Sequence, residues 1–125
     1  MKEVSSKIEY KEKTYKLVFN LNVMEEIQEE YETLQKWGEL TDGGTGEIGE
    51  KKKTQTEPNI KALIFGLTAM INEGIDIDND ENGTNEPFLS KKAVGRILSD
   101  VGIENVTAEM NNVVVESTKT EQKNG

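Results

Sequence analysis

The stretch KIEYKEKTYKLVFNLNVMEEIQEEYETLQKW, residues 7–37, decides the fold of this chain. It opens with two short segments, residues 7–10 and 14–19, in which apolar and polar residues alternate. Alternation with a period of two is typical of strands that bury one face. Because a lone hairpin is only marginally stable in water, we expect a β-hairpin over about residues 7–19 that packs on helices.

An acidic, amphipathic helix is predicted directly after the hairpin, over about residues 22–37. Asn20 or Asn22 can cap its first turn, since a short side-chain oxygen accepts from the free amides there, and Gly38 is a plausible end. Its apolar residues recur at three- and four-residue spacing, and they are Val23, Met24, Ile27, Tyr31, Leu34 and Trp37.

Apolar spacing and end signals predict three further helices, over about residues 58–73, 91–101 and 107–116. Pro58 suits the first turn of a helix and Gly74 its end. Ser90 is a good cap for the next helix, and Gly102 should stop it. In the last segment the run 113–115 is all Val, so a terminal strand is the alternative.

These elements predict a mainly α (α+β) fold in which an N-terminal β-hairpin packs on a bundle of three to four helices. A chain of 125 residues suits one domain, here residues 1–117, followed by a flexible tail at 118–125. The Gly- and Thr-rich segment 41–57 is predicted to be a flexible loop. Its lysine triplet, 51–53, lacks the spacing of a phosphate-binding Walker motif, so phosphate binding is not favoured.

The net charge of −9 arises from 24 acidic and 15 basic residues. This balance disfavours attraction to nucleic acid or to an anionic membrane, and it favours a protein partner. Mimicry of nucleic acid would fit the sign of the charge, but an acidic surface also serves solubility. No apolar stretch approaches the ~20 residues of a membrane helix, so a cytosolic protein is expected.

The chain contains neither Cys nor His. The absence of Cys excludes disulfides and thiolate chemistry, and the absence of His removes the commonest general base and transition-metal ligand. Neighbouring carboxylates on the first helix fall on its polar face, where a solvated or partner-facing role is simpler than acid catalysis. We therefore expect no enzyme, no catalytic residue and no cofactor.

Three aromatic side chains are the candidate protein-binding residues. Tyr31 and Trp37 lie on the apolar stripe of the first helix, either in the core or at the edge of a partner groove. Phe65 lies on a second apolar face of the helix predicted at 58–73. That helix is therefore either central in the core or covered by another chain.

The segment 73–86 holds six acidic residues and no Lys or Arg. It partly matches a calcium-binding loop, with Gly83 at the required turn, but Leu89 stands where the bidentate Glu should be. The first ligand positions would be filled by Asp78, Asp80 and Asn82. A solvated acidic connection is the favoured interpretation, and a weak calcium site at 78–86 is the alternative.

Three motifs carry a family resemblance: YKLVFNLN at 15–22, IKALIFGL at 60–67, and Ser90 followed by Val94-Gly95. The chain resembles the tail assembly chaperones of long-tailed bacteriophages and prophages. It departs from the simplest pattern in the loop at 41–57 and in an acidic insertion at 76–86.

The resemblance implies a small helical protein that binds the tape-measure protein and tail-tube subunits in the host bacterial cytoplasm. It also implies that the chaperone leaves before the virion matures. Association into a homo-oligomer is left open. The competing class is an acidic protein-binding module or inhibitor unrelated to phage assembly.

Overall fold

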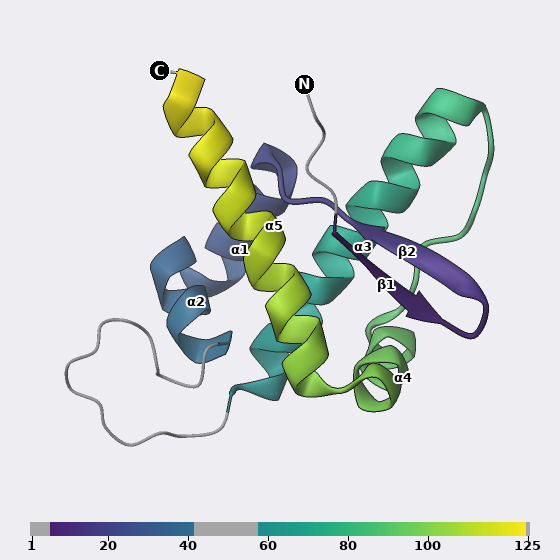
Figure 1. The fold of residues 1–125 in the computed structure, drawn as a ribbon, viewed down its shortest axis with the longest axis horizontal. Coiled ribbons are helices and arrows are strands. Elements are labelled where there is room, and N and C mark those ends of the chain that lie inside the picture. Colours follow the sequence, from purple (N-terminus) through teal and green to yellow (C-terminus); the bar gives the residue numbers. More distant parts are fainter. Residues whose placement is uncertain (1–5, 42–57, 125) are drawn as a thin grey trace.

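A computed structural model describes residues 6–41 and 58–124, with side chains described as far as Ser117. The described residues form an N-terminal hairpin packed against five helices, which confirms the predicted fold class (Figure 1). Of the loop predicted at 41–57, Thr41 belongs to the second helix, and the rest, with the lysine triplet, lies outside the described residues. The elements are β1 (Ser6–Tyr10), β2 (Lys13–Leu17), α1 (Leu21–Tyr31), α2 (Leu34–Thr41), α3 (Ile60–Asn82), α4 (Lys91–Val101) and α5 (Ile103–Asn124).

The two strands form an antiparallel pair in which Ile8 stands opposite Tyr15. A two-residue turn joins them, and both of its residues have positive φ angles, 46° for Lys11 and 65° for Glu12. This is the backbone of a type I′ turn, whose twist matches that of the strands, although its usual residues are Asn and Gly. The hairpin therefore forms despite an unfavourable turn sequence.

The single helix predicted over 22–37 is wrong, because α1 ends at Tyr31 and α2 begins at Leu34. Between them Glu32 has φ 73° and ψ −49°, and the Thr33 amide donates to the Tyr31 carbonyl at 2.8 Å. This γ-turn is rare and strained for a non-glycine residue. Thr33 then caps α2, since its hydroxyl oxygen accepts from the Lys36 amide at 3.0 Å.

The helix predicted over 58–73 extends farther, to Asn82, and Gly74 lies in its interior instead of at its end. A Cβ atom at Gly74 would lie 2.9 Å from the carbonyl oxygen of Lys16, so glycine lets β2 approach the helix closely. The helix ends at Gly83, which has a left-handed backbone with φ 68°. Pro58, which was predicted in the first turn, lies before the helix, and Asn59 caps that turn by accepting from the Ala62 amide.

The predicted caps of α4 are confirmed: Ser90 accepts from the Ala93 amide at 3.1 Å, and Gly102 ends the helix with φ 105°. The last helix was predicted at 107–116 but runs from Ile103 to Asn124, through the run of Val and into the predicted tail. The helix begins directly after Gly102, because the chain turns at this glycine and the Gly102 carbonyl accepts from the Val106 amide in the first turn. The alternative of a terminal strand is therefore wrong.

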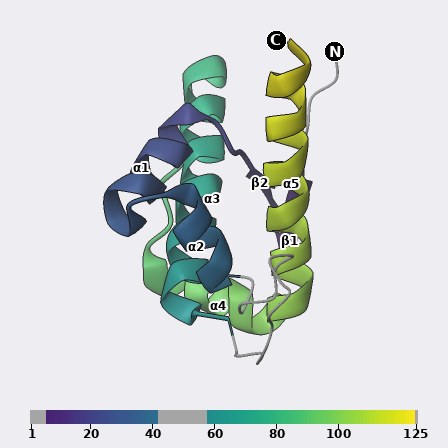
Figure 2. The ribbon, with the colours of Figure 1, turned by 90° about the vertical axis from the view of Figure 1, so that its left-hand side faces the viewer.

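Helix α3 is the centre of the fold. It contacts β2, α1, α2 and α4, while β1 packs on α4 and α5, so the hairpin joins α3 to α5 (Figure 2). The chain itself covers most of both apolar faces of α3, which fits a central position in the core, although Ile60 is exposed and Phe65 is half-buried. Its buried residues include Ala62, Leu63, Gly66, Leu67, Ala69, Met70, Ile71 and Gly74.

Two asparagines of α3 form hydrogen bonds to the main chain of the segment that connects α3 to α4. The Asn72 amide donates to the Leu89 carbonyl at 3.0 Å and its oxygen accepts from the Leu89 amide at 2.8 Å. Asn79 makes the same pair of bonds with Glu86, at 3.0 and 2.9 Å. Since the two asparagines are two helical turns apart, residues 86–89 are held parallel to the α3 axis.

Candidate functional site

Trp37 belongs to the core. Its side chain is 5% exposed, and its indole nitrogen donates to the carbonyl of Ala62 at 3.0 Å. The ring lies against Gly66, where an added Cβ atom would clash with Cζ2 and lie 2.9 Å from Cε2. Of the two sequence-based alternatives, core packing therefore describes most of this side chain.

Tyr31 and Phe65 are half-buried and contact each other edge to face, with ring centroids 5.6 Å apart and an angle of 72° between the rings. The structure thus brings together two of the three predicted site residues. The Tyr31 hydroxyl is buried and has no hydrogen-bond partner among the described residues. Burial raises the pKa of this hydroxyl above its usual 10.0, and the Glu30 carboxylate adds to the rise.

An apolar hollow of about 270 Å³ lies between α2 and α5, with α3 beneath it. We call it the α2–α5 groove; Figure 2 shows α2 in front of α3, with α5 standing beside them. The lining residues are Phe19, Leu34, Gln35, Trp37, Gly38, Thr41, Leu63, Thr107, Met110, Asn111 and Val114.

The groove has an apolar floor and a neutral polar rim. Phe19, Leu63 and Met110 are buried beneath it together with Trp37, while Asn111 is exposed. None of the described lining residues is ionisable. These residues supply no acid, base or nucleophilic carboxylate, so the groove is suited to binding apolar side chains and not to catalysis.

Only the α2 wall of this groove, with Leu34 and Trp37, lies on an apolar stripe that the sequence predicts. On α5 the lining residues follow the spacing i, i+3, i+4, i+7 of a single helix face, but two of the four, Thr107 and Asn111, are polar. A search for apolar stripes therefore passes over this face. The sequence pattern places Phe19 at the end of the hairpin. That it lines the groove together with α5 depends on contacts between distant parts of the chain.

The acidic connection predicted at 73–86 is helical as far as Asn82, so the calcium loop considered for residues 78–86 is not formed. Asp78, Asp80 and Asn82 lie on α3, where residues two apart point in different directions, so they cannot surround one ion as a loop does. Asp78 instead pairs with Lys16 at 3.1 Å. Within residues 6–41 and 58–124 no group of three or more acidic side chains is arranged to hold a metal ion.

The glutamates of α1 lie on its solvent-facing side, as predicted from their spacing. Glu25, Glu26, Glu29 and Glu30 are all exposed. An exposed carboxylate lacks the desolvation that a general acid requires at neutral pH. This face is therefore a solvated or partner-facing surface.

In the part of the chain that the structure describes, none of the helices combines the length and apolar character needed to span a membrane. Comparison of the chain with protein-family models, with curated proteins and with solved structures finds no match.

Proposed function

We propose that this protein is a phage tail assembly chaperone that binds an apolar helical segment of the tape-measure protein in the α2–α5 groove. The observation that carries the proposal is the groove itself: an apolar floor with an uncharged rim. Tail-tube subunits are the second proposed partner, and the host bacterial cytoplasm is the proposed place of action. No catalytic step is involved.

An amphipathic helix is the ligand that such a groove fits best. Helices that dock in grooves insert residues spaced at i, i+3, i+4 and i+7, and both walls here use that spacing. The α2 wall has Leu34, Trp37, Gly38 and Thr41 at these intervals, and the α5 wall has Thr107, Met110, Asn111 and Val114. A third helix laid between them would cover the apolar floor.

The residues that carry the family resemblance also form this groove. Phe19, from the first motif, and Leu63, from the second, both line it. Gly66, also in the second motif, leaves the space in which the Trp37 ring lies. The motifs thus support the groove as the surface on which a chaperone would act.

Co-expression with the tape-measure protein encoded nearby tests the proposal. We expect the two proteins to co-purify, and we expect Asn111→Arg to abolish the complex by placing a charge at the groove rim. Ala108→Arg is the matched control, since Ala108 is exposed on the same helix, does not line the groove, and the substitution adds the same charge.

Failure of the unsubstituted chain to co-purify at micromolar concentration would contradict the proposal. Equal loss of binding in Asn111→Arg and Ala108→Arg would also contradict it, because the added charge alone would then explain the loss, wherever it was placed. The gene order gives an independent check: a tail-tube gene should precede this gene, and a long tape-measure gene should follow it.

A further inference from the structure

A second hollow, of about 250 Å³, lies between α1, α3 and the start of α4. We call it the Phe88 hollow. Its lining combines the apolar side chains of Phe65, Ala69 and Phe88 with the carboxylates of Glu26, Glu73 and Asp76. It shares no lining residue with the α2–α5 groove.

Phe88 is an exposed aromatic residue on a fixed backbone. Its side chain is 56% exposed. Two residues before it, the main chain of Glu86 bonds to Asn79, and directly after it the main chain of Leu89 bonds to Asn72. The ring is therefore exposed to solvent on a backbone segment that hydrogen bonds hold on both sides. Rigid exposed aromatic side chains of this kind are frequent anchors in protein interfaces.

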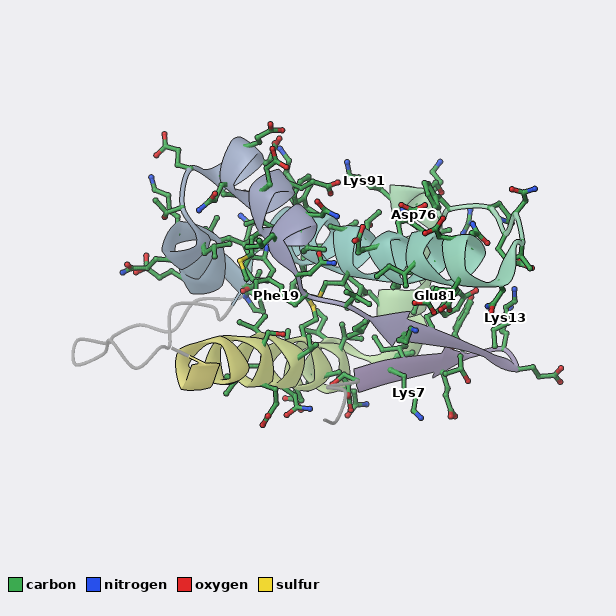
Figure 3. The ribbon with its side chains drawn as sticks, turned by 90° about the horizontal axis from the view of Figure 1, so that it is seen from above. Lys7, Lys13, Phe19, Asp76, Glu81 and Lys91 are labelled. Carbon is green, nitrogen blue, oxygen red and sulfur yellow. The ribbon has the colours of Figure 1, made fainter. Side chains whose placement is uncertain are left out.

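An ammonium group already lies on one aromatic ring of the hollow. Lys91 Nζ is 5.3 Å from the centroid of Phe65, within the range of a cation–π contact. Figure 3 shows Lys91 and Asp76 on the same side of the molecule, above α3. Lys91 also lines the hollow, so one cation of the chain already contacts one of its aromatic rings.

Two of the three carboxylates have no partner within residues 6–41 and 58–117. Glu73 accepts from the amides of Asn20 and Asn22 at 2.8 and 3.1 Å. Glu26 and Asp76 make no hydrogen bond and no ion pair with any described residue, and both are exposed. Since no described group of acids is arranged for a metal ion, a cation carried on an organic side chain is the better match.

We propose that the Phe88 hollow binds an arginine side chain of a partner protein. The guanidinium would stack on the ring of Phe88 and pair with the carboxylates of Glu26 and Asp76. Arginine fits better than lysine because its planar, weakly hydrated group stacks on aromatic rings and can bond two carboxylates at once. The net charge of −9 attracts such a segment from a distance.

The proposal goes beyond the chaperone function and does not depend on the α2–α5 groove. Its probe is the blocked dipeptide acetyl-leucyl-arginine amide, titrated to millimolar concentration into the full chain while amide NMR spectra are recorded. We expect saturable shifts of Phe88, Lys91 and Asp76. The neutral citrulline counterpart, which has nearly the same shape, should leave these signals in place.

Charge-neutral variants separate the hollow from general electrostatic attraction. Glu26→Gln with Asp76→Asn should weaken arginine binding about fivefold, in line with the loss of two exposed ion pairs. Glu9→Gln with Asp100→Asn removes the same charge from exposed positions outside the hollow and should leave the affinity within about twofold.

Phe88→Ala should also weaken binding, whereas Leu21→Ala, at a residue that is 71% exposed and outside the hollow, should not. Both substitutions are at exposed sites, so both variants should keep the helical circular dichroism of the parent. Equal shifts with arginine and citrulline, no shifts at all, or equal weakening by the two charge pairs would each overturn the proposal.

Discussion

The indole of Trp37 lies against Gly66, and this contact joins α2 to the central helix α3. The glycine leaves the room that the ring occupies, and the Ala62 carbonyl accepts the ring N–H at 3.0 Å. Because Trp37 also forms part of the floor of the α2–α5 groove, the packing that stabilises the fold also shapes the proposed binding surface.

Gly66→Ala should destabilise the protein. The added methyl group would clash with the Trp37 ring, and overpacking of this kind lowers the free energy of unfolding by roughly 1–3 kcal/mol. Gly38→Ala is the matched control, because a Cβ atom there has nothing within 4 Å and alanine favours a helix interior by about 1 kcal/mol. Urea unfolding should show opposite signs for the two variants, and equal stabilities would contradict this packing.

The hairpin turn should accept a stabilising change. Lys11→Asn combined with Glu12→Gly places the preferred residues at two positions with φ of 46° and 65°. We expect the free energy of unfolding to rise by about 1 kcal/mol, since each left-handed non-glycine residue costs about that much. Lys13→Asn, inside β2, should not raise it. A thermal unfolding midpoint that stays unchanged in the double variant would rule out the type I′ turn.

Tyr31→Phe should stabilise the protein or leave it unchanged, because the buried hydroxyl has no partner among the described residues. Leaving such a group unpaired costs about 1–3 kcal/mol. Tyr10→Phe, at a half-buried strand residue, is the control. A large loss of stability in Tyr31→Phe alone would show that the hydroxyl makes a bond in the folded protein.

The same hydroxyl predicts a pH dependence. Its folded pKa lies above the usual 10.0 because of burial and then Glu30, so the folded state holds this proton more tightly than the unfolded chain does. The resulting stabilisation is complete below pH 10.0 and is lost as pH rises through the folded pKa. The decline should be smaller in Tyr31→Phe, as measured by urea unfolding at several alkaline pH values.

The two asparagines of α3 should differ in importance. Asn72→Ala leaves a partly buried amide and carbonyl of Leu89 unbonded, which costs about 1–3 kcal/mol. Asn79→Ala exposes the corresponding groups of Glu86 to water at a site that is already exposed, so we expect less than about 1 kcal/mol. A greater loss in Asn79→Ala would contradict this order.

The fold class was predictable because alternation, apolar spacing and short polar caps are local signals. Ser90 caps the start of α4 and Gly102 ends it, as their residue types predict. Gly74 did not end a helix, because its lack of a side chain serves the close approach of β2. The break after Tyr31 carries no Gly or Pro signal, since Glu32 adopts its positive φ through the fold around it.

The candidate site was less predictable. The three aromatic residues were identified from one stripe and one helix face, and two of them, Tyr31 and Phe65, do meet. The groove itself needs α5 to lie opposite α2, which depends on packing between residues far apart in the chain. Phe88 gave no signal in the sequence, because its exposure depends on a backbone path that the bonds to Asn72 and Asn79 fix on either side of it.

Trp37 is the only tryptophan in the chain, which allows the most direct test of the α2–α5 groove. Fluorotryptophan-labelled protein should give one fluorine NMR signal, to be followed during titration with the unlabelled tape-measure protein. We expect a saturable shift of that signal, absent in Asn111→Arg and retained in Ala108→Arg. If the tape-measure protein binds and the Trp37 signal does not move, the α2–α5 groove is not its binding site.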